Sequence, residues 1–196
     1  MNVLRDRIAR RAAAIVDSGR EPDIRRAVRL AAESLGFREG APLPGDGEVR
    51  RHLRGMALER LGDAGYRESV DETLAFAAEA MDALERAFGA RTLLAGRAAR
   101  SQFDGGAVLH IRLYARASPQ DIATVLVDLG MDEPSFGTAE TVHGRASMVR
   151  SAIDGVDVNV LSCLPEWWDR RDLDLVTGRP TAVRTLESLR ADLCGG

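Results

Sequence analysis

One stretch, from Arg91 to Arg116, constrains the fold of this chain more than any other. It holds two apolar runs, which are separated by Gly96, by an arginine-rich segment and by Gly105-Gly106. Short apolar runs between glycine-containing breaks are typical of β-strands joined by turns. The stretch therefore predicts a strand, a glycine-punctuated turn and a second strand, and this turn is where we expect a ligand site.

The residues before this stretch have the spacing of amphipathic helices. Apolar side chains recur three or four positions apart over residues 3–18, 20–36, 48–61 and 66–88. Pro22 is expected in the first turn of the second helix, where proline is tolerated, and the proline- and glycine-rich residues 40–47 are expected to form a loop or linker. We predict a helical N-terminal region over residues 1–63 and a second domain over residues 64–196.

The residues after Arg116 predict a mixture of helices and strands. Ser118 and Pro119 mark the start of a helix that runs toward Gly130. We expect a strand over 134–143, a hairpin over 145–162 that turns at Asp154-Gly155, irregular structure or a short helical turn over 165–180, and a closing helix over 181–193. The fold class is therefore α+β, with a helical N-terminal region followed by a mixed β-sheet flanked by helices.

Composition excludes several classes of protein. The formal charge of -3 gives no bulk argument for binding nucleic acid or an anionic membrane, although local basic patches remain open. All 27 basic residues are arginine, so lysine chemistry such as a Schiff base or a P-loop is excluded. The N-terminus threads charges through its apolar residues, unlike a signal peptide, and no segment has the length of a membrane span. We expect a cytoplasmic protein with no membrane partner.

The layout from Arg91 to Ser162 resembles the nucleotidyltransferase superfamily, and the wider chain is similar to a group of small bacterial proteins of this class. In that superfamily a first strand leads into a Gly-Ser turn, the next strand carries two acids in an alternating hDhDh pattern, and a later strand carries a third acid. The turn over residues 177–180, TGRP, before a leucine-patterned helix is part of the resemblance. It implies a nucleotidyltransferase-like mixed sheet flanked by helices.

The catalytic acids of the superfamily are missing from this chain. Two acids at a spacing of two on a strand point the same way and together hold the divalent metals that bridge nucleotide phosphates. Aligned with that pattern, Gly96-Arg97 occupies the turn, and Val108 and His110 occupy the two acid positions. Asp157 aligns with the third acid and has Asn159 beside it on the same strand face. We therefore assign no catalytic residue, no metal ligand and no cofactor.

Basic side chains stand where the resemblance implies metal. Cationic groups can bind a phosphate without catalysing its transfer. We predict a catalytically degenerate protein that binds a nucleotide, another phosphate ligand or a partner, and the candidate binding residues are Gly96, Arg97, Arg100, His110, Arg112, Asp157 and Asn159. The alternative is a decayed site whose arginines are solvated or paired with Asp104 and Asp157.

Two other functions stay open. An active nucleotidyltransferase with a rearranged site would use Asp157, Asp104 or Asp154 to hold a single Mg²⁺, and only then is a cofactor expected. A structural or interaction module would instead use the N-terminal helices to bind a protein partner. Trp167 and Trp168 either stack a base or lock a loop against the core, and we favour the second role because proline borders the turn.

Overall fold

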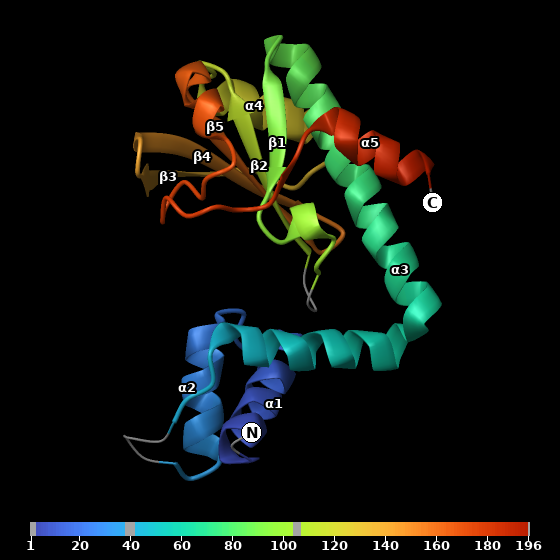
Figure 1. Ribbon diagram of the computed structural model, residues 1–196, viewed down its shortest axis with the longest axis vertical. Coiled ribbons are helices and arrows are strands. Elements are labelled where there is room, and N and C mark those ends of the chain that lie inside the picture. The colour runs from blue at the N-terminus through green and yellow to red at the C-terminus, as the bar shows by residue number, and fades with distance from the viewer. Residues whose placement is uncertain (1–2, 38–41, 104–106, 196) are drawn as a thin grey trace. The chain divides into compact units, whose positions relative to one another are not determined.

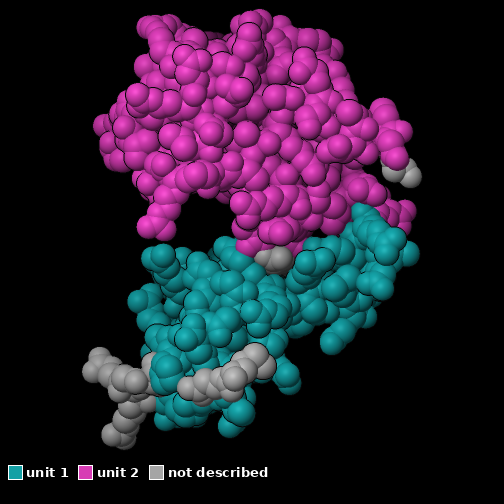
Figure 2. Space-filling model, viewed as in Figure 1, with its two compact units in different colours: residues 1–67 teal, residues 68–196 magenta. Residues whose placement is uncertain are grey.

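The chain divides into two compact units, Met1–Arg67 and Glu68–Gly196, which Figure 2 distinguishes by colour. The computed structural model describes residues 3–37, 42–103 and 107–195. Helix α3 (Asp46–Phe88) contributes to both units, and its backbone leaves the helical conformation at Gly62, where φ is 70° and ψ is 171°. Such a backbone conformation is almost restricted to glycine. The interruption therefore falls between the two helices that the sequence predicts over 48–61 and 66–88.

The first unit is helical. Helices α1 (Val3–Asp17) and α2 (Ile24–Ser34) pack with the first part of α3 around a core rich in alanine, which lets helices approach closely. An ion pair and a hydrogen bond also join α3 to α1: Arg5 lies 2.6 Å from Glu48, and His52 Nε2 lies 3.0 Å from Asp6 Oδ1. Packing of apolar helix faces therefore accounts for this unit, as its sequence periodicity predicts.

The prediction for Pro22 is wrong. Pro22 precedes the N-cap of α2, which is Asp23, instead of lying in the first helical turn. The Asp23 carboxylate accepts a hydrogen bond from the backbone N–H of Arg26 at 2.8 Å. An aspartate at the N-cap satisfies a backbone donor that proline cannot satisfy, so the helix begins after Asp23.

The second unit is built on one mixed sheet. Among the described residues six strands form it, in the order β3-β4-β5-β2-β1-β6. Their bounds are β1 (Arg91–Ala95), β2 (Ala107–Tyr114), β3 (Ser135–Thr141), β4 (Gly144–Ile153), β5 (Val156–Cys163) and β6 (Val183–Arg184). Neighbouring strands are antiparallel except for β2 and β5, which are parallel. The α+β class is therefore confirmed, and β1 to β5 lie in the segments of the chain that the sequence predicts to be strands.

Helices cover one face of the sheet. Leu94, Ile111 and Val160 on this face are fully buried, and in Figure 1 helix α4 (Pro119–Asp128) lies behind the strands. The Ser118 side chain caps α4 by accepting a hydrogen bond from the Asp121 N–H at 3.1 Å. Glu85 of α3 accepts hydrogen bonds from the N–H and hydroxyl of Thr92 in β1, at 2.8 and 2.9 Å. This face forms the main core of the unit.

A long connection crosses the opposite face. It leaves β5, forms the 3-10 helix η2 (Pro165–Arg170), and passes in front of the strands in Figure 1 before it reaches β6 and helix α5 (Leu186–Cys194). Trp167 and Trp168 pack against the small core cluster beneath it, which confirms that they hold this segment against the sheet. The cluster is centred on the buried residues Leu93, Tyr114, Cys163 and Leu175.

The predicted start of the last helix is wrong. The sequence predicts a helix from Thr181, but Val183 and Arg184 pair with β1, and α5 begins only after the N-cap Thr185. The edge of β1 presents backbone groups that need partners, and the chain beside it supplies them. The Gly96 N–H, for example, donates to the carbonyl of Ala182 at 2.8 Å.

No helix in the described part of the chain is long and apolar enough to cross a membrane.

Candidate functional site

The strand register brings predicted site residues onto one face of the sheet. In the parallel pairing of β2 with β5, His110 lies opposite Asn159, and Val108 lies opposite Asp157. On the other side of β2, His110 lies opposite Ala95 of β1. Residues that lie opposite each other in a sheet share a face. The face crossed by the long connection therefore carries His110, Asn159 and Asp157, and Arg112 as the next residue of β2 on that face.

Four of the seven predicted site residues line one cavity of about 280 Å³. Gly96, His110, Arg112 and Asn159 contribute to its wall. Apolar side chains from β4, β5 and the long connection fill much of the rest, namely Met148, Leu161, Leu175 and Val176. A mostly apolar cavity with a few converging polar groups is the usual form of a small-molecule site.

The other three predicted residues do not line this cavity. After Ala95 the chain turns at Gly96, with φ of 77°, into the short 3-10 helix η1 (Ala98–Arg100). That helix buries its alanines, Ala98 and Ala99, so Arg100 is directed into solvent, and Arg97 lies half-buried outside the cavity wall. The structure therefore does not place these two arginines in the wall that holds His110 and Arg112.

Asp157 also lies outside the cavity, although it shares the sheet face with Asn159. It is exposed and pairs with the exposed Val108, one step along the strands from His110 and Asn159. Asp104, which the sequence analysis considers as a metal ligand or a partner for arginine, lies outside the described residues. The cavity therefore differs from the predicted site chiefly in losing Asp157, Arg97 and Arg100.

Arg112 is the most deeply buried charged group of the cavity wall. Its side chain is 6% exposed. The Nη1 group donates hydrogen bonds to the carbonyls of Arg171 and Leu173, each at 2.9 Å. Ion pairs in the described part of the chain are made by other arginines, so Arg112 has no carboxylate at ion-pair distance there. A buried cation without a bonded anion is costly and attracts negative charge.

The surroundings of His110 favour its neutral form. Part of its ring remains exposed, but withdrawal of the rest from water lowers its pKa below the usual value, and the positive charge of Arg112 lowers it further. The negative charge of Asp174 opposes both effects without reversing them. A neutral imidazole can both donate and accept a hydrogen bond, and a nearby anion would raise its pKa again.

Asp174 belongs to the cavity wall but was missed by the sequence analysis. Its Oδ1 accepts hydrogen bonds from the N–H groups of Val176 and Thr177, at 3.1 and 2.7 Å, and from the Thr177 hydroxyl at 2.8 Å. Burial alone would raise the pKa of Asp174, but these hydrogen bonds and the charge of Arg112 lower it below its usual value. The available signal was an aspartate just before the TGRP turn, because aspartate often bonds the backbone of the turn that it begins.

The described residues contain no group of three or more His, Cys, Asp or Glu side chains that could hold a metal ion. Asp154 lies in the β4–β5 turn, where it and Gly155 have φ of 48° and 79°. Two positive φ values are typical of a tight hairpin turn, so this aspartate has a conformational role. The polar groups that the cavity wall offers to a ligand include the guanidinium of Arg112, the imidazole of His110 and the amide of Asn159, besides the Asp174 carboxylate.

Neither a protein-family model nor a curated protein matches this chain.

Proposed function

We propose that this chain is a catalytically degenerate protein of nucleotidyltransferase type that binds a nucleotide or another phosphate ligand in the cavity of Arg112. The observation that carries the proposal is the buried guanidinium of Arg112 in a cavity wall, without a carboxylate at ion-pair distance among the described residues. His110 and Asn159 add hydrogen-bonding groups to the same wall. Charge-assisted bonds from guanidinium to phosphate are among the stronger hydrogen bonds in proteins.

The proposed relationship to the nucleotidyltransferases gives these groups a role. His110 stands at a position where the superfamily carries an acid, and the partner strand of β2 supplies Asn159 directly opposite. In that superfamily the acids of this strand hold metals that in turn bind phosphate. Here imidazole and guanidinium would contact the phosphate directly, so the ligand could be bound without a metal. Because basic groups stand in place of the acids, we expect this chain to bind a phosphate ligand without catalysing phosphoryl or nucleotidyl transfer.

Calorimetry with inorganic phosphate, pyrophosphate and nucleoside triphosphates, each with and without Mg²⁺, tests the proposal. We expect saturable binding that does not require Mg²⁺. His110→Ala and Asn159→Ala should each weaken it, and Arg112→Lys should weaken it by about 1.5–3 kcal/mol if one charge-assisted bond is lost. Arg145→Gln is a matched control, because Arg145 is a largely exposed arginine of β4 outside the cavity wall.

Two results would contradict the proposal. If none of these ligands binds, the phosphate-binding function is wrong and a protein-partner role becomes the better explanation. If a labelled triphosphate and Mg²⁺ give a labelled product, the protein is an active enzyme. In that case Asp157→Asn should abolish turnover, since Asp157 is the described carboxylate that aligns with a catalytic acid of the superfamily.

A further inference from the structure

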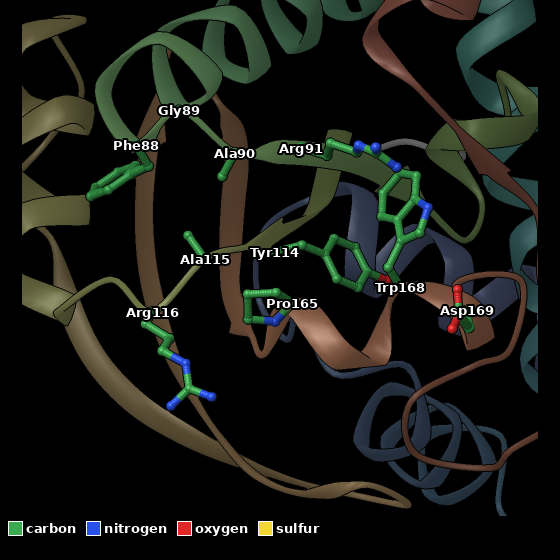
Figure 3. A pocket seen from close by; sticks show the side chains of 10 residues that line it. All are labelled: Phe88, Gly89, Ala90, Arg91, Tyr114, Ala115, Arg116, Pro165, Trp168 and Asp169. Carbon is green, nitrogen blue, oxygen red and sulfur yellow. The ribbon is translucent and has the colours of Figure 1, made fainter.

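A second cavity, of about 650 Å³, opens at the other end of the same sheet face. It lies where β1 begins and β2 ends, because Arg91 and Tyr114 are paired there. Figure 3 shows the side chains that line it, which come from the end of α3, from β1, from the end of β2 and from η2. Its volume is in the range of small-molecule sites, and its wall shares no residue with that of the first cavity.

Arg91 supplies the cavity with a guanidinium that is held in place and free to bind. Its Cζ lies 4.8 Å from the centre of the Trp168 ring, and Figure 3 shows the side chain extending over that indole. No carboxylate among the described residues forms an ion pair with it. Contact with the indole holds the guanidinium in place and does not use up its N–H groups, which can bind an anion.

Trp168 is fixed from other directions. Its ring meets that of Tyr114 edge to face, with centroids 5.0 Å apart and an interplanar angle of 86°. A second guanidinium, that of Arg171, lies 5.0 Å from the centre of the same indole. Tyr114 is itself 5% exposed and belongs to the core cluster beneath the connection. The platform under Arg91 is therefore formed before any ligand arrives, which lowers the entropy cost of binding.

The charges at the cavity select against a highly charged ligand. Arg116, the other cation of the wall, already pairs with Glu166 at 2.6 Å, and Asp169 adds a second carboxylate. Of the two arginines in this wall, Arg91 is the one that no described carboxylate pairs, and Asp169 places a negative charge in the same wall. A single anionic group can bind Arg91, whereas a further negative charge would meet the carboxylate of Asp169 in the same wall. The apolar side chains of Phe88 and Pro165 line the same space and can contact a hydrocarbon body.

We propose that this cavity is a second ligand site, which binds a small monocarboxylate with an apolar body. Its carboxylate is held by the edge of the Arg91 guanidinium, and its body lies against the apolar wall. The site is independent of the proposed phosphate site in its ligand and in its residues. A ligand with a dianionic phosphate group on the same body binds more weakly here, in contrast to the first cavity.

Titration of the full chain with benzoate, followed by tryptophan fluorescence and by calorimetry, tests this site. We expect saturable binding that shifts the tryptophan emission. Arg91→Gln should weaken benzoate binding at least tenfold, because it removes the charge from an exposed position while keeping a polar side chain. Arg145→Gln, an equivalent change on a largely exposed arginine of β4, should leave it unchanged. Thermal unfolding of each variant checks that the fold is retained.

Two further ligands distinguish the chemistry. Benzyl alcohol has a similar body without the charge, and phenyl phosphate carries a second negative charge near neutral pH. Because phenyl phosphate can also enter the proposed phosphate site, the comparison uses only the binding that Arg91→Gln removes; for that binding we expect both ligands to be at least tenfold weaker than benzoate. Equal binding of benzyl alcohol would overturn the role of Arg91, and tighter binding of phenyl phosphate would overturn the assignment to a monocarboxylate. Absence of saturable benzoate binding up to about 10 mM, beyond the range of weak ligands, would overturn the site itself.

Discussion

Replacing Arg112 by methionine should loosen the long connection that crosses the open face of the sheet. Arg112 donates two hydrogen bonds, each of 2.9 Å, to the carbonyls of Arg171 and Leu173. Methionine can replace the aliphatic part of the arginine side chain, but it is shorter and offers no hydrogen-bond donor. The substitution therefore removes the link between β2 and the connection while disturbing the packing of the core little.

The size of the effect follows from two opposing contributions. A hydrogen bond to a charged group contributes about 1.5–3 kcal/mol, so loss of two bonds costs roughly 3–6 kcal/mol. Arg112 is 6% exposed, and removing a buried cation that lacks a bonded carboxylate recovers part of its desolvation penalty, which is several kcal/mol. We expect the loss of the hydrogen bonds to prevail and the free energy of unfolding to fall by about 2 kcal/mol.

Urea unfolding followed by tryptophan fluorescence measures this change, since both tryptophans lie in the connection. Hydrogen exchange should show faster exchange over residues 165–181 and unchanged exchange in α4. Arg145→Met is the matched control and should alter neither property, because Arg145 is 68% exposed. Equal or greater stability of Arg112→Met would show that desolvation outweighs the two hydrogen bonds and would refute the clamping role.

Three further predictions concern the same face of the sheet. Phosphate binding in the first cavity should tighten as the pH falls from about 8 to about 6, because a bound anion raises the lowered pKa of His110 and favours its charged form. Calorimetry at both pH values measures this dependence, which should vanish in His110→Ala. Asp174 has a lowered pKa in the folded state, so its contribution to the free energy of unfolding is present above the usual pKa of 3.8 and is lost as the pH falls through the lower folded-state pKa. Urea unfolding of Asp174→Asn at several acidic pH values should lack this loss of stability. Tyr114→Phe should leave stability unchanged or raise it by up to about 1 kcal/mol in thermal unfolding, because the buried hydroxyl makes no hydrogen bond of good geometry with a described residue, whereas a clear loss would show that it bonds the nearby Arg112 guanidinium.

Local signals in the sequence predict most of the second unit. Ser118-Pro119 begins α4 as expected, and Asp154-Gly155 forms the turn between β4 and β5. Alternation in VDVNV places Asp157 and Asn159 on one face of β5, away from the buried Val158 and Val160. Caps, tight turns and strand alternation depend on neighbouring residues alone, so a single sequence carries the information for them.

The failures have tertiary causes. Val183 continues the apolar spacing of the last helix, but Val183 and Arg184 pair with the edge of β1 and form a strand instead. Arg97 and Arg100 are close to Gly96 in sequence, yet neither lines the cavity that Gly96 lines. Asp174 reaches the cavity only because the connection folds back across the sheet. Proximity in sequence does not determine which residues of a turn face a cavity. A contact between β2 and a connection about sixty residues later in the chain leaves no local pattern in the sequence.

Arg112 links the two cavities through the connection that it holds. Its hydrogen bonds fix the carbonyl of Leu173, next to Asp174 in the first cavity, and the carbonyl of Arg171, whose side chain lies against Trp168 in the second. A residue that only bound phosphate would, when changed, affect the first cavity alone. A residue that also positions η2 should alter both. Arg112→Lys is therefore expected to weaken phosphate binding strongly and benzoate binding slightly. Asn159→Ala should affect phosphate only, since among the described residues Asn159 makes no hydrogen bond to the connection like those of Arg112. If Arg112→Lys leaves benzoate binding unchanged, the two cavities are uncoupled and Trp168 is positioned by Tyr114 and Arg91 alone.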